Sequence, residues 1–233
     1  MSSRRAAFGS WVLGVVISVA LLAGCGLRQV NGVFWEQPGT LVYRSGLSKA
    51  ANARAFELLK NTQAKPRLLK ITSDGGDVHL GMDLGEWVFK NGLDVEVVDH
   101  CFSSCANYVL PAGKTKILNP DAILLWHGGA YQPDLEQQLK DTGEAGLAFM
   151  NAWRTREDLF FKMIGVNQSI TTYGQTGPHV VRAKGAAGWD FSIEDMARLG
   201  IKNIVEKGGP WRWRELRPEF QTMVFRVEVI EAR

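Results

Sequence analysis

The sequence predicts an α/β fold with a largely parallel sheet, and three observations support that class. The composition, 45% apolar and 22% charged over 233 residues, is that of a globular chain with a sizeable core. Segments of strand type alternate with helical segments over the middle of the chain, as in folds whose parallel strands are joined through helices. No internal repeat is visible, and the length suits one domain or at most two. Disordered chains, collagen-like repeats and minimal disulfide scaffolds are excluded.

Strands are expected where short apolar runs are bounded by turn residues, and helices where apolar residues recur every three or four positions. The expected strands are 40–43, 67–72, 93–98, 115–118, 122–126, 201–205 and 222–229. The expected helices are 48–62, one that opens directly after Gly76, 106–112, 133–164 and 192–200. Asn119-Pro120-Asp121 separates two of the strands, and Gly143 and Gly146 mark the weak point of the long helix. Ser192, followed by acids two and three residues on, is typical of a helix N-terminus.

The first 25 residues predict an export signal. Arg4 and Arg5 precede an apolar run of 13 residues, and Leu22-Ala23-Gly24-Cys25 closes it. This tetrapeptide resembles the bacterial lipobox, in which the Cys25 thiol is acylated and becomes the mature N-terminus. The alternative is an uncleaved membrane anchor over 6–27, which has 22 residues without a charge.

Both interpretations place the body outside the cytoplasm, tethered to a membrane. We therefore expect a lipoprotein signal peptide over 1–24, a membrane-proximal linker over 25–39, and a single domain over 40–233 that ends in a C-terminal strand extension. The expected location is the cell envelope, with the lipid-anchored body facing the periplasm and the choice of inner or outer membrane left open.

The charge of the body is nearly balanced. The whole chain has 27 Lys and Arg against 24 Asp and Glu, and two of the basic residues lie in the export signal. A body at about +1 with no basic stripe does not indicate nucleic-acid binding. The basic, aromatic segment 211–214 is interpreted as a surface turn before the last strand.

Cys101 and Cys105 remain once Cys25 is assigned to lipid. In an oxidising compartment such a pair can form a disulfide, and two buried thiols or an oxidisable pair are the alternatives. A zinc site with His100 ranks last, because this segment offers too few ligands. No metal or other cofactor is expected.

Three segments have a composition that packing alone does not explain. The turn Ser73-Asp74-Gly75-Gly76 joins a strand to a helix, where backbone N–H groups can face an oxyanion. Ser103 and Ser104 open an apolar helix; Ser103 suits an N-cap, and Ser104 is the candidate to face a ligand. His127 follows a strand, at the edge of an α/β sheet where ligands bind.

In their order and spacing these segments resemble the Clp protease proteolytic subunit and its relatives in the Clp/crotonase superfamily. The Gly75-Gly76 pair is similar to the family's oxyanion loop. Ser104 begins a helix that runs to Ala112-Gly113, like the nucleophile helix of the family, and Pro120 precedes His127 by seven residues. Residues 189–201 give a weaker echo of a later helix. The resemblance implies a repeated ββα superhelix, with residues 133–164 as the helical handle that mediates ring assembly.

The resemblance also implies a serine hydrolase site. Ser104 would be the nucleophile, His127 its base, and the N–H groups of Gly75 or Gly76 and of Cys105 the oxyanion donors. The third member departs from the family pattern, because a gap-free count puts Lys184 where the family has its acid. Asp190 is the nearest acid, with Glu194 and Asp195 as further candidates, and a Ser-Lys pair through Lys184 is an alternative.

The expected function is that of an extracytoplasmic, ATP-independent serine peptidase that acts on a peptide or an unfolded protein, with homo-oligomers formed through the helix 133–164. A catalytically inactive binding or scaffold lipoprotein of the same fold is the first alternative. An acyl-CoA enzyme of the crotonase type is the second, although coenzyme A is scarce outside the cytoplasm.

Overall fold

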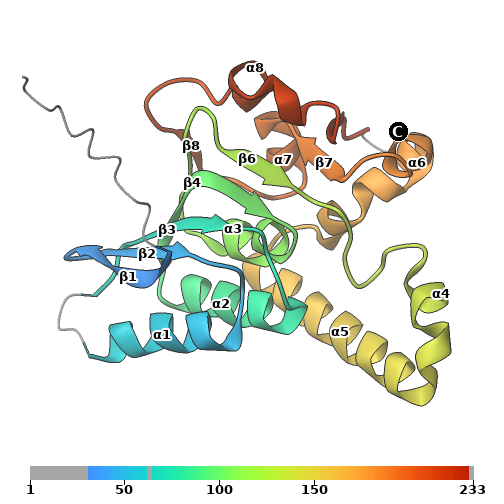
Figure 1. Cartoon of the computed structure of the whole chain (residues 1–233), viewed down its shortest axis with the longest axis horizontal. Helices are drawn as coiled ribbons and strands as arrows, with labels where there is room; N and C mark the ends of the chain where they lie inside the picture. The colour runs from blue at the N-terminus through green and yellow to red at the C-terminus, as the bar shows by residue number, and fades with distance from the viewer. Residues whose placement is uncertain (1–30, 62–64, 231–233) are drawn as a thin grey trace, which may run out of the picture.

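A computed structural model describes residues 31–61 and 65–230 (Figure 1). The elements follow in chain order: β1 (Gly32–Gln37), β2 (Thr40–Arg44), α1 (Lys49–Lys60), β3 (Leu68–Ser73), α2 (Val78–Lys90), β4 (Asp94–Phe102), η1 (Cys105–Val109), α3 (Leu110–Ala112), β5 (Lys116–Leu118), β6 (Ile123–Leu125), α4 (Leu135–Leu139), η2 (Lys140–Thr142), α5 (Gly143–Ile164), η3 (Gln168–Thr171), η4 (Tyr173–Gln175), η5 (Gly177–His179), α6 (Val180–Ala183), β7 (Gly188–Phe191), α7 (Ile193–Arg198), β8 (Ile204–Glu206), α8 (Trp213–Leu216), η6 (Pro218–Phe220) and β9 (Val224–Val227).

The main sheet has seven strands in the order β1-β2-β3-β4-β5-β8, and β6 pairs with β4. Every pairing in it is parallel except the antiparallel pair of β1 and β2. The α/β class expected from the alternating pattern is therefore confirmed, as a mixed sheet with helices. β7 and β9 form a separate two-stranded parallel sheet. It is joined to the main sheet by a bridge between Trp126 and Trp189.

Strand β4 is long enough to pair with different neighbours along its length. Its first half pairs with β5, from Val95 to Val97, and its second half pairs with β6, from His100 to Phe102. The ends of β3, β4 and β6 consequently meet at the carboxyl edge of the sheet, and the segments that follow them are brought together there.

Apolar residues of β2, β3 and β4 form one core with helix α2. Leu69, Ile71, Val95 and Val97 are fully buried and belong to the same cluster as Met82. Figure 1 shows α1 and α2 on one side of the sheet, with α4 and α5 running out from the body. In the described residues no helix combines the length and the apolar character needed to cross a membrane.

The structure corrects one boundary of the domain. Residues 25–39 were expected to be a linker, yet 32–37 form strand β1, which pairs with β2 in a hairpin. A two-residue turn at Pro38 and Gly39, with φ of +84° at Gly39, closes that hairpin. The expected signal peptide, lipobox and Cys25 lie outside the described residues.

Candidate functional site

The turn between β4 and η1 carries Ser103 in a left-handed backbone conformation, with φ of +56°. The Ser103 N–H donates to the carbonyl of Leu125 at 2.8 Å, and the Ser103 carbonyl accepts from Asn107 N–H at 2.9 Å. A non-glycine residue held in this region costs of order 1–3 kcal/mol and persists only where its surroundings impose it. The side chain is thereby presented at the apex of a strand-to-helix turn, the placement of nucleophiles in many hydrolases.

Gly75 lies directly against this turn. A Cβ atom on Gly75 would lie 2.7 Å from Ser103 Cβ and 2.6 Å from the carbonyl oxygen of Phe102. Gly75 also has φ of +87°, so both space and backbone angle require glycine here. The glycine turn after β3 and the serine turn after β4 therefore form one compact unit.

His127 pairs with Ser103. Its Nε2 lies 2.7 Å from Ser103 Oγ, which is hydrogen-bonding distance for a serine and its base. Partial burial lowers the pKa of the His127 imidazole, although the residue remains exposed by its accessible surface. A depressed pKa keeps the ring neutral near pH 7, the state in which it can accept a proton.

The structure does not bring His127 to Ser104, the nucleophile expected from the sequence. Ser104 is 2% exposed, and its hydroxyl donates to the carbonyl of Gly76 at 2.9 Å. The physical reason is the π-helix η1, in which Leu110 N–H bonds to the carbonyl of Cys105, five residues earlier. A π-turn holds one residue more than an α-turn, so a gap-free count back from Ala112-Gly113 ends one residue too late.

The expected oxyanion donors are only partly available. Gly75 N–H donates to Ser73 Oγ at 3.2 Å, which engages it within its own turn. Gly76 N–H meets no acceptor among residues 31–61 and 65–230. The amides of Ser104 and Cys105 open the helix, where backbone N–H groups have no partner within the helix. The amides of Gly76, Ser104 and Cys105 are thus the candidates for an oxyanion donor.

The acids expected to orient His127 lie elsewhere. Asp190 is fully buried and accepts hydrogen bonds from Trp213 Nε1 at 2.9 Å, Arg214 at 2.6 Å and Arg226 at 2.8 and 2.9 Å. Glu194 and Asp195 both bind Arg198, and Lys184 is exposed. In the described part of the chain no carboxylate bonds to His127, so the site is a Ser103–His127 pair.

The Asp190 network also explains the basic, aromatic segment 211–214. Trp213 is 1% exposed and Arg214 ends on a buried carboxylate. Both side chains therefore tie the segment to Asp190 of the two-stranded sheet. The segment was expected to be a surface turn before the last strand; instead Trp213 is buried and begins helix α8.

Two amide side chains hold the backbone beside His127. Gln175 Nε2 donates to the His127 carbonyl at 3.1 Å, and Asn107 Nδ2 donates to the Gly128 carbonyl at 2.8 Å. Sequence reasoning missed both, because a lone Gln in a 3₁₀ turn and a lone Asn in an apolar helix form no motif. The one available signal was Asn107 itself, a polar residue at a position that the apolar pattern predicts to be buried.

Glu157 of α5 binds the loop that follows His127, at Ala130. Its carboxylate accepts from Ala130 N–H at 3.2 and 3.3 Å, from Tyr108 OH at 2.6 Å and from Gln168 Nε2 at 2.7 Å. Burial raises the pKa of this fully buried acid, against the lowering effect of those hydrogen bonds. Sequence reasoning missed Glu157 as well, since an acid inside a long helix is usually solvated.

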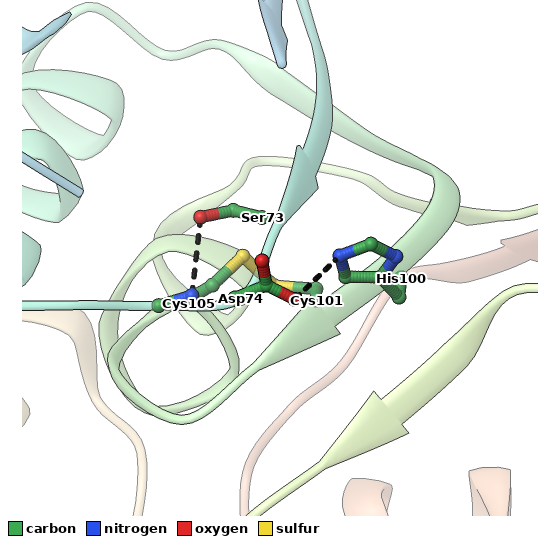
Figure 2. The surroundings of a disulfide bond; sticks show 6 residues. Ser73, Asp74, His100, Cys101 and Cys105 are labelled. Atoms are coloured by element: carbon green, nitrogen blue, oxygen red, sulfur yellow. Dashed lines mark hydrogen bonds and ion pairs between the residues drawn. A yellow bond between two sulfur atoms is a disulfide. The ribbon is translucent and has the colours of Figure 1, made fainter. Parts of the chain in front are cut away.

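Cys101 and Cys105 form a disulfide, so of the three states left open by the sequence the structure has the bridged one. The bond links the end of β4 to η1 and spans the Ser103 turn (Figure 2). The described residues contain no group of three or more His, Cys, Asp or Glu side chains placed to hold a metal ion.

His100 lies between two carboxylates next to the disulfide. Its Nε2 is 3.1 Å from Asp74 Oδ1, the contact drawn in Figure 2, and its Nδ1 is 2.8 Å from Asp99 Oδ2. Burial acts to raise the pKa of Asp99, but the hydrogen bonds and charges of His100 and Arg217 prevail and lower it. Asp74 belongs to the glycine turn, so these contacts tie that turn to β4.

No protein-family model matches the chain, and no curated protein matches its sequence. The assignment of function therefore rests on the residues and their geometry.

Proposed function

We propose that the protein is a serine hydrolase in which Ser103 is the nucleophile and His127 its general base. The observation that carries this proposal is the 2.7 Å contact between Ser103 Oγ and His127 Nε2, made by a serine at a strained strand-to-helix turn. An unactivated hydroxyl is a poor nucleophile at neutral pH and needs a base at this distance.

The proposed reaction is acyl transfer through a covalent intermediate. Ser103 Oγ attacks the carbonyl carbon of the substrate while its proton passes to His127 Nε2. The N–H groups of Gly76 and of Ser104 or Cys105 stabilise the oxyanion; a single such donor is worth about 100- to 1,000-fold in rate. His127 then gives its proton to the leaving group, and a water molecule releases the acyl group from Ser103.

The proposed substrate class and setting rest on the resemblance and on the export signal in the sequence. We propose a member of the Clp/crotonase superfamily with its ββα superhelix, anchored through lipid on Cys25 to the envelope and acting on short or unfolded peptides without ATP.

We further propose that α5 joins copies of the chain, since Leu147 and Leu159 on it are 50% and 64% exposed. Size measurement by light scattering tests this, and a monomer at micromolar concentration would contradict it.

Labelling with a fluorophosphonate tests the nucleophile in the full-length protein. We expect wild type to react and Ser103→Ala to lose the reaction completely. His127→Ala should react about 100- to 10,000-fold more slowly, the usual contribution of a general base. Ser104→Ala is the matched control, because it removes the adjacent hydroxyl and should keep the reaction. Loss in Ser104→Ala with retention in Ser103→Ala would assign the reaction to the other serine.

An inactive binding module of the same fold is the second candidate. The observation that favours it is the missing acid: removing the orienting acid from a triad costs about 10⁴-fold. Folded wild-type protein that fails to react with the fluorophosphonate would select this candidate.

A further inference from the structure

A buried lysine lies at the edge of the sheet opposite the proposed active site. Lys116 is the first residue of β5 and is only 6% exposed. It pairs in register with Val95, near the start of β4, whereas Ser103 follows the end of β4. The ammonium group of a lysine is almost never buried without a partner, because its desolvation is costly. Lys116 has no ion pair and its Nζ makes no hydrogen bond within residues 31–61 and 65–230.

The side chain lines a cavity of about 380 Å³, a size in the range of small-molecule sites. Lys114 and Lys202 also line this cavity, and both are exposed whereas Lys116 is buried. No acidic residue is among the lining residues. The cavity therefore concentrates three positive charges with no negative charge in its wall.

Within the described residues, the surrounding helix ends give the Lys116 ammonium no hydrogen-bond partner. The cavity borders the C-terminal ends of α2, α3, α5 and α7, whose partial negative charge offsets part of the burial cost. One carbonyl near the end of each helix already accepts a backbone N–H group: Gly92 donates to Phe89 at 3.0 Å, Gly113 to Leu110 at 3.2 Å, Gly165 to Phe161 at 3.0 Å and Gly200 to Ala197 at 3.0 Å. None of these bonds involves the Lys116 ammonium, which makes no hydrogen bond to these helix ends in the described residues.

We infer that this cavity is a binding site for a small anion that carries carboxylate or phosphate groups, lined by the buried Lys116 and by the exposed Lys114 and Lys202. Burial alone lowers the pKa of Lys116 to about 8, which leaves most of the ammonium charged at pH 7. A bound anion supplies the missing counter-charge and hydrogen-bond acceptors. The site is separate from Ser103 and does not depend on the proposed hydrolase activity.

Amine acetylation of the full-length wild-type protein tests the site without any substitution. Only neutral amines react, and an anion beside Lys116 should raise its pKa by about one unit, which slows its acetylation about tenfold at pH 7. We expect this protection with millimolar inorganic phosphate, succinate or both, and not with chloride at equal ionic strength. Protection of Lys116 by phosphate indicates a phosphoryl ligand, and protection by succinate indicates a dicarboxylate. Lys162, exposed on α5, is the internal control and should react equally in every buffer.

Thermal unfolding gives the second measurement. A ligand that binds only the folded state raises the unfolding temperature. Phosphate or succinate should do so for wild type and for Lys162→Met, and should lose the effect in Lys116→Met. If Lys116→Met does not fold, the double variant Lys114→Met/Lys202→Met replaces it and should weaken the effect. Unchanged acetylation of Lys116 in both anions, or equal thermal shifts in wild type and variant, would overturn the inference.

Discussion

Ser103 and Ser104 have the same side chain and different surroundings. Ser103 is half-buried, faces His127 and has a left-handed backbone angle, while Ser104 is enclosed and donates to the Gly76 carbonyl. A hydroxyl that donates to a carbonyl inside the fold stabilises the turn that holds it. The Ser104 hydroxyl is thus engaged within the fold, whereas the Ser103 hydroxyl faces His127.

The pH dependence of fluorophosphonate labelling reports on His127. The base must be neutral, and burial holds the pKa of His127 below its ordinary value of 6.5. More than half of the molecules are therefore reactive at pH 6.5, and the rate should fall only at more acidic pH. Stopped-time labelling across a pH series measures the midpoint. A midpoint above 6.5 would indicate an acid near the ring, which raises the pKa of a histidine.

Substitution of Asp190 tests whether this acid stabilises the fold or orients His127. Asp190→Asn leaves Arg214 and Arg226 without their full counter-charge, and breaking such a buried cluster costs about 3 kcal/mol. Denaturant unfolding measures that loss. Labelling of the folded fraction should change by less than about threefold, against the roughly 10⁴-fold expected if Asp190 oriented the base. A collapse of labelling in a stable variant would restore Asp190 to the site.

At the scale of elements, local sequence patterns predicted the regular strands and helices well. The expected strand 67–72 is β3, the expected helix 48–62 is α1, and the serine at 192 caps α7 through Asp195 N–H at 3.0 Å. Alternation and capping are local, so they are legible in a single sequence. Strand β1 was missed because its short segment, residues 32–37, has no long apolar run.

The sequence predicted which three segments form the candidate site, but it did not predict which of the two serines faces His127. The three segments that meet at the carboxyl edge each end a strand, and strand ends are recognisable from turn residues. The displacement from Ser103 to Ser104 arose from a π-turn, which depends on packing in η1 and leaves no mark in the sequence. The prediction that Asp190 orients His127 was wrong for a similar reason. The partners of Asp190 lie 23 to 36 residues further along the chain, so its environment depends on tertiary packing.

The disulfide links the end of β4 to the start of η1, and its removal should change both the stability of the protein and the reactivity of Ser103. Cys101→Ala/Cys105→Ala opens a loop of five residues; chain entropy predicts a loss of about 2 kcal/mol in the free energy of unfolding. Because the bond spans the Ser103 turn, labelling should also slow. Urea unfolding and labelling rates measure the two effects.

The state of the bond is measured on the peptide that contains both cysteines. Protein taken from its native compartment is alkylated without reductant, and the mass of this peptide shows whether either thiol has reacted. No alkylation is expected at Cys101 or Cys105. Two alkylated thiols would contradict a structural bridge, and unchanged labelling in the double variant would show that the turn holds without it.

At the scale of the whole molecule, Glu157 joins parts that are far apart in the chain. It lies on α5 and binds Tyr108 of η1, Ala130 of the loop after His127 and Gln168 of η3. Trp153, one turn earlier on α5, donates to the same Tyr108 hydroxyl at 3.0 Å. The long helix is therefore anchored to both sides of the proposed active site through one buried carboxylate.

Substitutions of Glu157 should lower stability by amounts that depend on pH. Glu157→Ala leaves buried donors without an acceptor, at about 1–3 kcal/mol each, whereas Glu157→Gln keeps one oxygen and loses less. Because burial raises the pKa of Glu157, its stabilising effect is complete below the ordinary value of 4.5 and declines as pH rises through the folded-state pKa. The stability gap between wild type and Glu157→Gln should thus be wider at pH 4.5 than at pH 7. Asp158→Asn, the exposed neighbour that contacts Tyr131, is the control and should change little. A gap that widens toward neutral pH would mean that the hydrogen bonds to the charged carboxylate outweigh its burial.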